Sequence, residues 1–211
     1  KGFLQAVPKV ATIKKKVLFT GYAQNDLTEF LDFCMNCFHN SLHRDVDMVI
    51  KGEVVSETDE IAKKCFEMMR NMYKTDYSEF LKLFYGISVS KIVSESGTYK
   101  NITPEPFFNI CVPMTNGSLY DCLKLYTSVE DLTGDNQLYN EKTKEKEDAK
   151  KRIMFWSLPD ILVITLKRFN NNARKDQRLI DFEFPFLHLI YYQDPEHLLH
   201  LLLHYSLLRY Y

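Results

Sequence analysis

The chain has 211 residues, of which 45% are hydrophobic and 26% charged, with a net charge of −1 at pH 7. This composition is that of an ordinary globular protein with room for one good core or two small ones. The near-zero charge argues against a nucleic-acid binder, whose domains are usually clearly basic. We also predict no membrane association, because no apolar stretch reaches spanning length and the N-terminus lacks a signal-peptide pattern.

The cysteines indicate a reducing environment. There are five of them, too few and too scattered for a disulfide framework in a chain of this size. We therefore predict an intracellular protein, cytoplasmic or nuclear.

The first half of the chain predicts helices. Residues 2–20 are loosely patterned and carry a solvated cationic patch at Lys14, Lys15 and Lys16, whereas helices are expected at 26–44, 58–74 and 77–85. Apolar residues recur at helical spacing through the first of these helices, and Asn25 or Asp26 can cap it.

From residue 86 onward the pattern favours strands, at 87–94, 107–112, 158–169 and 180–184. A short capped helix begins near Ser118, and the charged run 140–152 is expected to be a solvated hairpin or a short helical arm. The strand at 158–169 is the most informative segment. Its apolar run, typical of a strand buried on both faces, stops abruptly at Lys167, Arg168 and Phe169 and must leave the core there.

Four blocks occur in a fixed order along the chain: QNDLTEFL (24–31), SLYDCL (118–123) after a phenylalanine-led strand, EDLTGDN (130–136) and LPDILVITLKRF (158–169). In this order and spacing they resemble the ubiquitin-specific protease family, papain-like cysteine proteases that cut after the carboxyl terminus of ubiquitin. The resemblance implies an α+β, papain-like fold with a helical thumb and a mixed β palm with fingers, present here in incomplete form. It covers a partial protease domain at 1–185 and leaves 186–211 as a divergent tail rich in Leu, His and Tyr.

The resemblance also implies a binding site for the ubiquitin tail. Asp26 matches the family aspartate that holds the backbone of this tail, and Phe169, with Leu166 beside it, matches the wall of the channel that threads it. A simple helix cap is the alternative role for Asp26, and both roles can coexist. The partner expected is ubiquitin or a ubiquitinated protein.

No catalytic residue is assigned. The family's cysteine box and its Gly-Gly-His-Tyr box find no proper match, and the pair His204-Tyr205 is interpreted as a coincidence because leucines replace the glycines. The five cysteines, Cys34, Cys37, Cys65, Cys111 and Cys122, are all interpreted as structural.

No metal or other cofactor is expected either. Many relatives hold a zinc ion in their fingers with two Cys-x-x-Cys pairs, but the matching positions here are Val93, Ser96, Asn140 and Thr143. The other metal-like cluster, Cys34 and Cys37 with two nearby histidines, lacks a second ligand pair and is interpreted as core.

Two functional hypotheses follow. In the first, this is the palm-and-fingers portion of a deubiquitinating enzyme whose parent hydrolyses ubiquitin isopeptide bonds, and the chain alone is inactive. In the second, it is a ubiquitin-binding or scaffold pseudo-protease that has lost catalysis.

Overall fold

The computed structural model describes residues 2–21, 24–169 and 174–181, and it confirms the predicted α+β class. The helices are α1 (Gly2–Ile13), α2 (Leu27–Leu42), α3 (Glu57–Tyr73), α4 (Glu79–Phe84) and α5 (Leu119–Tyr126), with 3₁₀ turns η1 (Val17–Phe19) and η2 (Gly134–Asn136). The strands are β1 (Gly86–Ser94), β2 (Lys100–Phe107), β3 (Asn109–Pro113), β4 (Glu130–Leu132), β5 (Leu138–Asn140), β6 (Glu145–Glu147), β7 (Ala149–Ser157) and β8 (Val163–Lys167). None of the helices in these ranges has the length and hydrophobicity of a membrane span.

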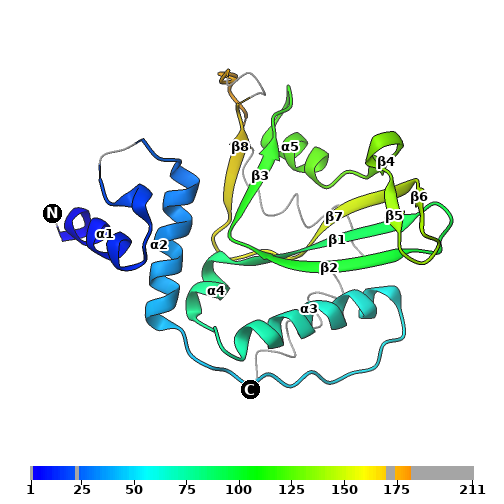
Figure 1. The fold of residues 1–211 in the computed structure, drawn as a ribbon, viewed down its shortest axis with the longest axis horizontal. Coiled ribbons are helices and arrows are strands. Elements are labelled where there is room, and N and C mark those ends of the chain that lie inside the picture. Colours follow the sequence, from blue (N-terminus) through cyan, green and yellow to red (C-terminus); the bar gives the residue numbers. More distant parts are fainter. Residues whose placement is uncertain (1, 22–23, 170–173, 182–211) are drawn as a thin grey trace.

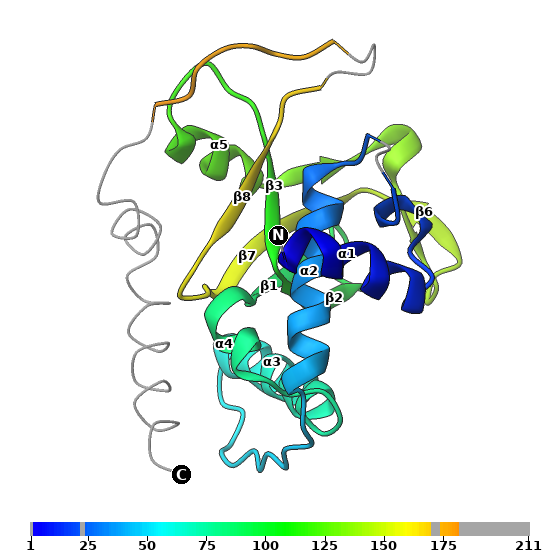
Figure 2. The ribbon, with the colours of Figure 1, turned by 90° about the vertical axis from the view of Figure 1, so that its left-hand side faces the viewer.

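The N-terminal unit consists of α1, η1 and α2, with α1 lying across α2 (Figure 2). Its core joins Ala11 of α1 and Phe19 of η1 to Phe33 and Cys34 of α2. Helix α1 corrects the prediction of a loosely patterned segment at 2–20. It forms although Pro8 lies inside it, a residue that normally disrupts a helix interior.

A four-stranded antiparallel sheet in the order β2-β1-β7-β4 forms the centre of the molecule, with α3 against one face (Figure 1). The core between them contains Cys65 of α3, Val89 of β1 and Trp156 of β7. Salt bridges from Lys91 and Lys100 to the start of α3 flank this core. Burial of this apolar face is what holds the helix on the sheet.

Three strands of this sheet were not predicted: β2, β7 and the short β4. Strand β7 begins inside the charged run 140–152, where a solvated hairpin or helical arm was expected, although the β5–β6 hairpin does occupy its first part. Strand β2 contains Pro104 and Pro106, which argue against a strand, yet it lies at the edge of the sheet, where prolines are tolerated.

A second sheet contains β8, the last strand in the described part of the chain. Strands β3 and β8 pair in parallel, with Val112 opposite Leu166, and α5 packs against them. Strand β8 covers five residues in place of the twelve predicted at 158–169. The predicted strand 180–184 falls mostly outside the described residues.

Candidate functional site

The start of α2 and the middle of β8 meet. The Oγ1 atoms of Thr28 and Thr165 lie 3.5 Å apart although 137 residues separate them along the chain. Thr165 also donates a hydrogen bond of 2.9 Å to Asn109 Oδ1 on β3. Short polar side chains thus join α2, β3 and β8 at this junction, and the surface where α2 and β8 meet is called the crevice below.

Asp26 is the N-cap of α2. Its Oδ1 accepts hydrogen bonds from the backbone N–H groups of Thr28, at 2.7 Å, and Glu29, at 3.2 Å. Among the described residues, the second carboxylate oxygen of this exposed side chain accepts none. The capping role is confirmed, and the geometry leaves Oδ2 able to accept an N–H from a bound peptide.

Leu166 and Phe169 lie in different environments. Successive side chains of a strand point to opposite faces, and Thr165 faces α2, so Leu166 faces the core beneath α5, where it packs. Leu166 can therefore support the crevice from behind but does not line its α2 side. Phe169 is 67% exposed beyond the end of β8 and pairs with Lys175 in an isolated antiparallel bridge. The ubiquitin-tail role of Asp26, Leu166 and Phe169 stays a prediction.

The segment that returns past the end of β8 is fixed by Arg168. Its guanidinium donates to the backbone oxygens of Asp176, at 3.1 Å, and Arg178, at 2.7 Å. The Asp176 carboxylate accepts from Arg178, and these bonds lower the pKa of Asp176 to about 2. This hydrogen-bonded turn holds the backbone beside Phe169 in place.

Negative charge gathers at the start of α2. Burial raises the pKa of the Asp32 carboxyl most, and repulsion from Asp26 and Glu29 raises it further. The helix N-terminus partly offsets this charge, since its unpaired N–H groups carry positive potential. The crevice consequently favours a ligand that brings N–H donors or positive charge.

Within the described residues, no hydrogen bond joins a cysteine sulfur to a histidine nitrogen. Burial raises the pKa of the Cys65 thiol to about 12, and burial also raises that of Cys34. The imidazole of His39 is bonded to other side chains, and His204 lies outside the described residues. The described part of the chain thus holds no thiol–imidazole pair of the kind that cysteine proteolysis needs.

The fingertip, where the β1–β2 turn meets the β5–β6 hairpin, is a polar network. Asn140, fully buried, donates to the Oγ1 of Thr98, at 2.9 Å, and to the carboxylate of Glu147, which also accepts from the hydroxyl of Ser96. These hydrogen bonds lower the pKa of Glu147, and the bond from Ser96 has the largest effect. Two of the four positions named above for zinc, Ser96 and Asn140, are thus joined by one carboxylate.

Sequence reasoning missed this network. Thr98 and Glu147 are ordinary polar residues in charged turns, and only the pairing of distant segments brings them together. No group of three or more His, Cys, Asp or Glu side chains that could hold a metal ion occurs in the described ranges.

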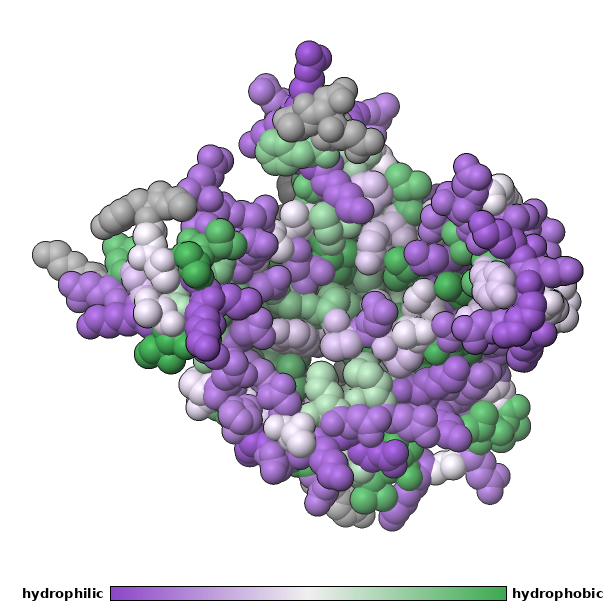
Figure 3. Space-filling view, in the orientation of Figure 1, coloured by the Kyte–Doolittle hydropathy of each residue, from purple (hydrophilic) through white to green (hydrophobic). Residues whose placement is uncertain are grey.

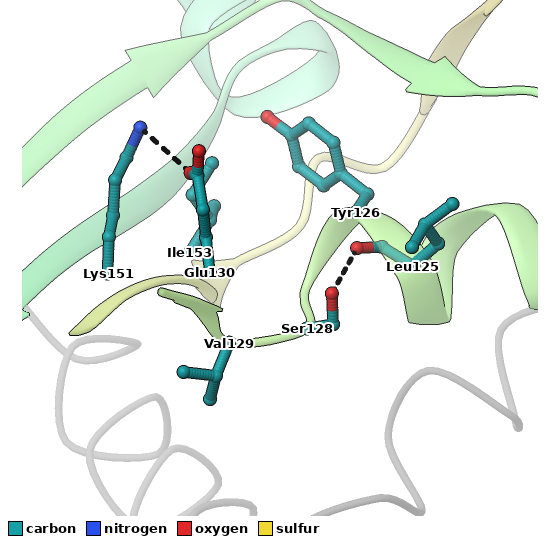
Figure 4. A pocket seen from close by; sticks show the side chains of 7 residues that line it. All are labelled: Leu125, Tyr126, Ser128, Val129, Glu130, Lys151 and Ile153. Carbon is teal, nitrogen blue, oxygen red and sulfur yellow. Dashed lines mark hydrogen bonds and ion pairs between the residues drawn. The ribbon is translucent and has the colours of Figure 1, made fainter. Parts of the chain in front are cut away.

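A separate pocket of about 320 Å³ lies between the end of α5, β4 and β7 (Figure 4). Apolar side chains alternate on its walls with an ion pair of 3.6 Å between Lys151 and Glu130, and Ser128 donates to the backbone oxygen of Leu125. Its charges and the Ser128 hydroxyl are already paired, and burial raises the pKa of the Tyr126 hydroxyl, so the pocket offers no activated nucleophile. The middle of the face shown in Figure 3 mixes apolar and polar surface, whereas the finger end is mainly hydrophilic.

Comparison with known proteins gives the family. The model of the ubiquitin carboxyl-terminal hydrolase family matches residues 5–208. Ubiquitin carboxyl-terminal hydrolase 2 of Bos taurus is 27% identical over 178 residues, covering 79% of this chain and 28% of that protein. A probable ubiquitin carboxyl-terminal hydrolase of Acanthamoeba polyphaga mimivirus is 30% identical over 161 residues, covering 70% of this chain and 34% of that protein.

A solved structure shows the same fold. The chain superimposes with a TM-score of 0.57 and 22% identity on a chain of the SAGA Ubp8/Sgf11/Sus1/Sgf73 DUB module bound to ubiquitin aldehyde, over 86% of this chain and 36% of that one. The chain spans less than half the length of the relatives described here. The resemblance carried by the four sequence blocks is therefore confirmed: the chain belongs to the ubiquitin carboxyl-terminal hydrolase family.

Proposed function

We propose that the described residues form the ubiquitin-recognising part of a deubiquitinating cysteine protease. The observation that carries this proposal is the contact between Thr28 and Thr165, which places the start of α2 beside the middle of β8. The crevice so formed receives the C-terminal tail of ubiquitin, the partner that family membership suggests. The whole enzyme hydrolyses the isopeptide bond that follows this tail.

The crevice suits an extended peptide better than a folded surface. Asp26 Oδ2 accepts an N–H from the tail, while Oδ1 continues to cap α2. Phe169 provides an exposed aromatic wall, and the turn held by Arg168 keeps the backbone beside it in place. Between such walls glycine passes most easily, because it has no side chain to clash, and this matches the Gly-Gly end of ubiquitin.

Catalysis needs groups beyond those described. A thiolate, an imidazole that accepts its proton and donors for the oxyanion must be supplied outside residues 2–21, 24–169 and 174–181. Cytoplasmic or nuclear location, with no nucleic acid and no membrane as partner, completes the proposal.

Binding of the full chain to ubiquitin tests the proposal, with ubiquitin lacking its last two glycines as the matched ligand. Asp26→Ser is the informative variant, because serine caps a helix nearly as well as aspartate but offers no second carboxylate oxygen. We expect Asp26→Ser to keep the unfolding free energy within about 0.5 kcal/mol and to weaken ubiquitin binding about tenfold, the loss of one charge-assisted hydrogen bond.

Two results would contradict the proposal. One is equal affinity for full-length and shortened ubiquitin. The other is an unchanged affinity in Asp26→Ser, which would leave Asp26 with its capping role alone.

A further inference from the structure

A buried histidine joins three elements at the far end of α2 from the crevice. His39, 5% exposed, lies in the last turn of α2. Its Nδ1 is 2.6 Å from Ser78 Oγ at the start of α4, and its Nε2 is 2.8 Å from Asp76 Oδ1 in the preceding loop. Both ring nitrogens are therefore used.

The trio has the residue types of a hydrolase triad but not its geometry. Ser78 is fully buried, so no substrate reaches its hydroxyl. The Asp76 carboxylate can only accept, so the Nε2–H of His39 donates to it, and the Ser78 hydroxyl is the partner of Nδ1. The trio holds α2, the loop before α4 and the start of α4 together, and its serine does not act as a nucleophile.

The same trio belongs to a closed ring of contacts. Ser78 precedes α4, and at the other end of α4 the backbone oxygen of Leu83 accepts a 2.8 Å hydrogen bond from the N–H of Ile161. Ile161 lies two residues before β8, whose Thr165 returns to α2 at Thr28. Figure 1 shows α4 beside the lower part of α2 and below β8, in the position that closes this ring.

We propose that His39 is a positioning residue for the crevice between α2 and β8, acting through α4. The expected effect on ubiquitin binding rests on the proposed function, whereas the ring of contacts does not depend on it. The bonds of His39 to Ser78 and Asp76 set the tilt of α2, and the tilt sets the distance between Asp26 and the wall at β8.

Because α2 is long, a small tilt at its His39 end produces a large displacement of its start. A helix of 16 residues is about 24 Å long at 1.5 Å per residue, so a tilt of about 3° at the His39 end moves its start by roughly 1 Å. Displacements of that size are enough to degrade a preorganised site. A loosened His39 is therefore expected to weaken tail binding without unfolding the sheet.

Three substitutions in the full chain test the proposal. Ser78→Ala removes the partner of Nδ1, and Asp76→Ala removes the partner of Nε2. Asp76→Asn keeps an oxygen that accepts from Nε2–H and is the conservative rescue. Ser41→Ala is the matched control, since Ser41 lies in the same turn of α2, is exposed and, within the described part of the chain, bonds only to the backbone oxygen of Phe38.

Two readouts are needed: ubiquitin affinity, and hydrogen exchange of the Thr28 and Glu29 amides that Asp26 caps. We expect Ser78→Ala and Asp76→Ala to speed exchange at these two amides about tenfold and to weaken ubiquitin binding about tenfold. Exchange in β1 and β7 stays as in the unmodified chain. Asp76→Asn and Ser41→Ala behave like the unmodified chain in both readouts.

A uniform rise in exchange through β1 and β7 would overturn the inference, because it would show a general structural role. Failure of Asp76→Asn to rescue, or an unchanged exchange rate at Thr28 and Glu29, would overturn it as well. If the unmodified chain binds no ubiquitin, the proposed function fails, while the exchange measurements still decide whether His39 positions α2.

Discussion

Asn140 is predicted to be the residue on which the fingertip depends most. It is fully buried, its amide nitrogen donates to Thr98 and Glu147, and its Oδ1 accepts a 2.9 Å hydrogen bond from the backbone N–H of Lys142. Asn140→Ala removes all three bonds. Since each contributes on the order of 1 kcal/mol net, we expect a loss of about 2–3 kcal/mol in the free energy of unfolding.

Urea unfolding followed by the fluorescence of Trp156 measures this loss. Trp156 is the single tryptophan and is 4% exposed in the core between the four-stranded sheet and α3. For a chain of this size the loss corresponds to a fall in melting temperature of roughly 4–12 °C. Thr143→Ala, at an exposed position in the same hairpin, is the control and should change stability by less than about 0.5 kcal/mol. Equal unfolding midpoints for the two variants would refute the reasoning.

Three other predictions follow from the structure. The lowered pKa of Glu147 means that its contribution is fully present above the usual value of 4.5 and is lost as pH falls below it; Glu147→Gln should flatten this acid limb of the stability–pH curve, and an unaltered limb would count against it. Gly86→Ala places a Cβ 2.6 Å from the backbone oxygen of Ser157 and should cost about 1–3 kcal/mol by thermal unfolding, unlike Gly21→Ala, where the space is open. Iodoacetamide at pH 8 should leave Cys65 unmodified in the folded chain and modify it in urea, because burial raises its pKa; mass spectrometry of the peptides decides.

Local signals in the sequence predicted helices α2 to α5 and their starts, but not α1. Asp26 caps α2, and Ser118 caps α5 and forms a capping box with Asp121. Each of these contacts joins residues that are two or three positions apart in the sequence. Such contacts depend only on neighbouring residues, so a sequence pattern can reveal them.

The missed elements depend on distant contacts. Strand β7 is charged in its first half, and it forms because Lys151 and Arg152 can pair with β1 while Trp156 fills the core against α3. Likewise, the crevice could be predicted from two family blocks, but the orientation of Leu166 toward α5 depends on the strand register, which no single segment reveals.

The prolines of β2 also affect how these molecules meet one another. An edge strand with free N–H and C=O groups invites another polypeptide to add to the sheet, which can lead to polymers and amyloid. Pro104 and Pro106 carry no N–H, so this border of the sheet is a poor template for such growth. At concentrations where proteins with unprotected edge strands aggregate, this protein should not associate through the β2 edge.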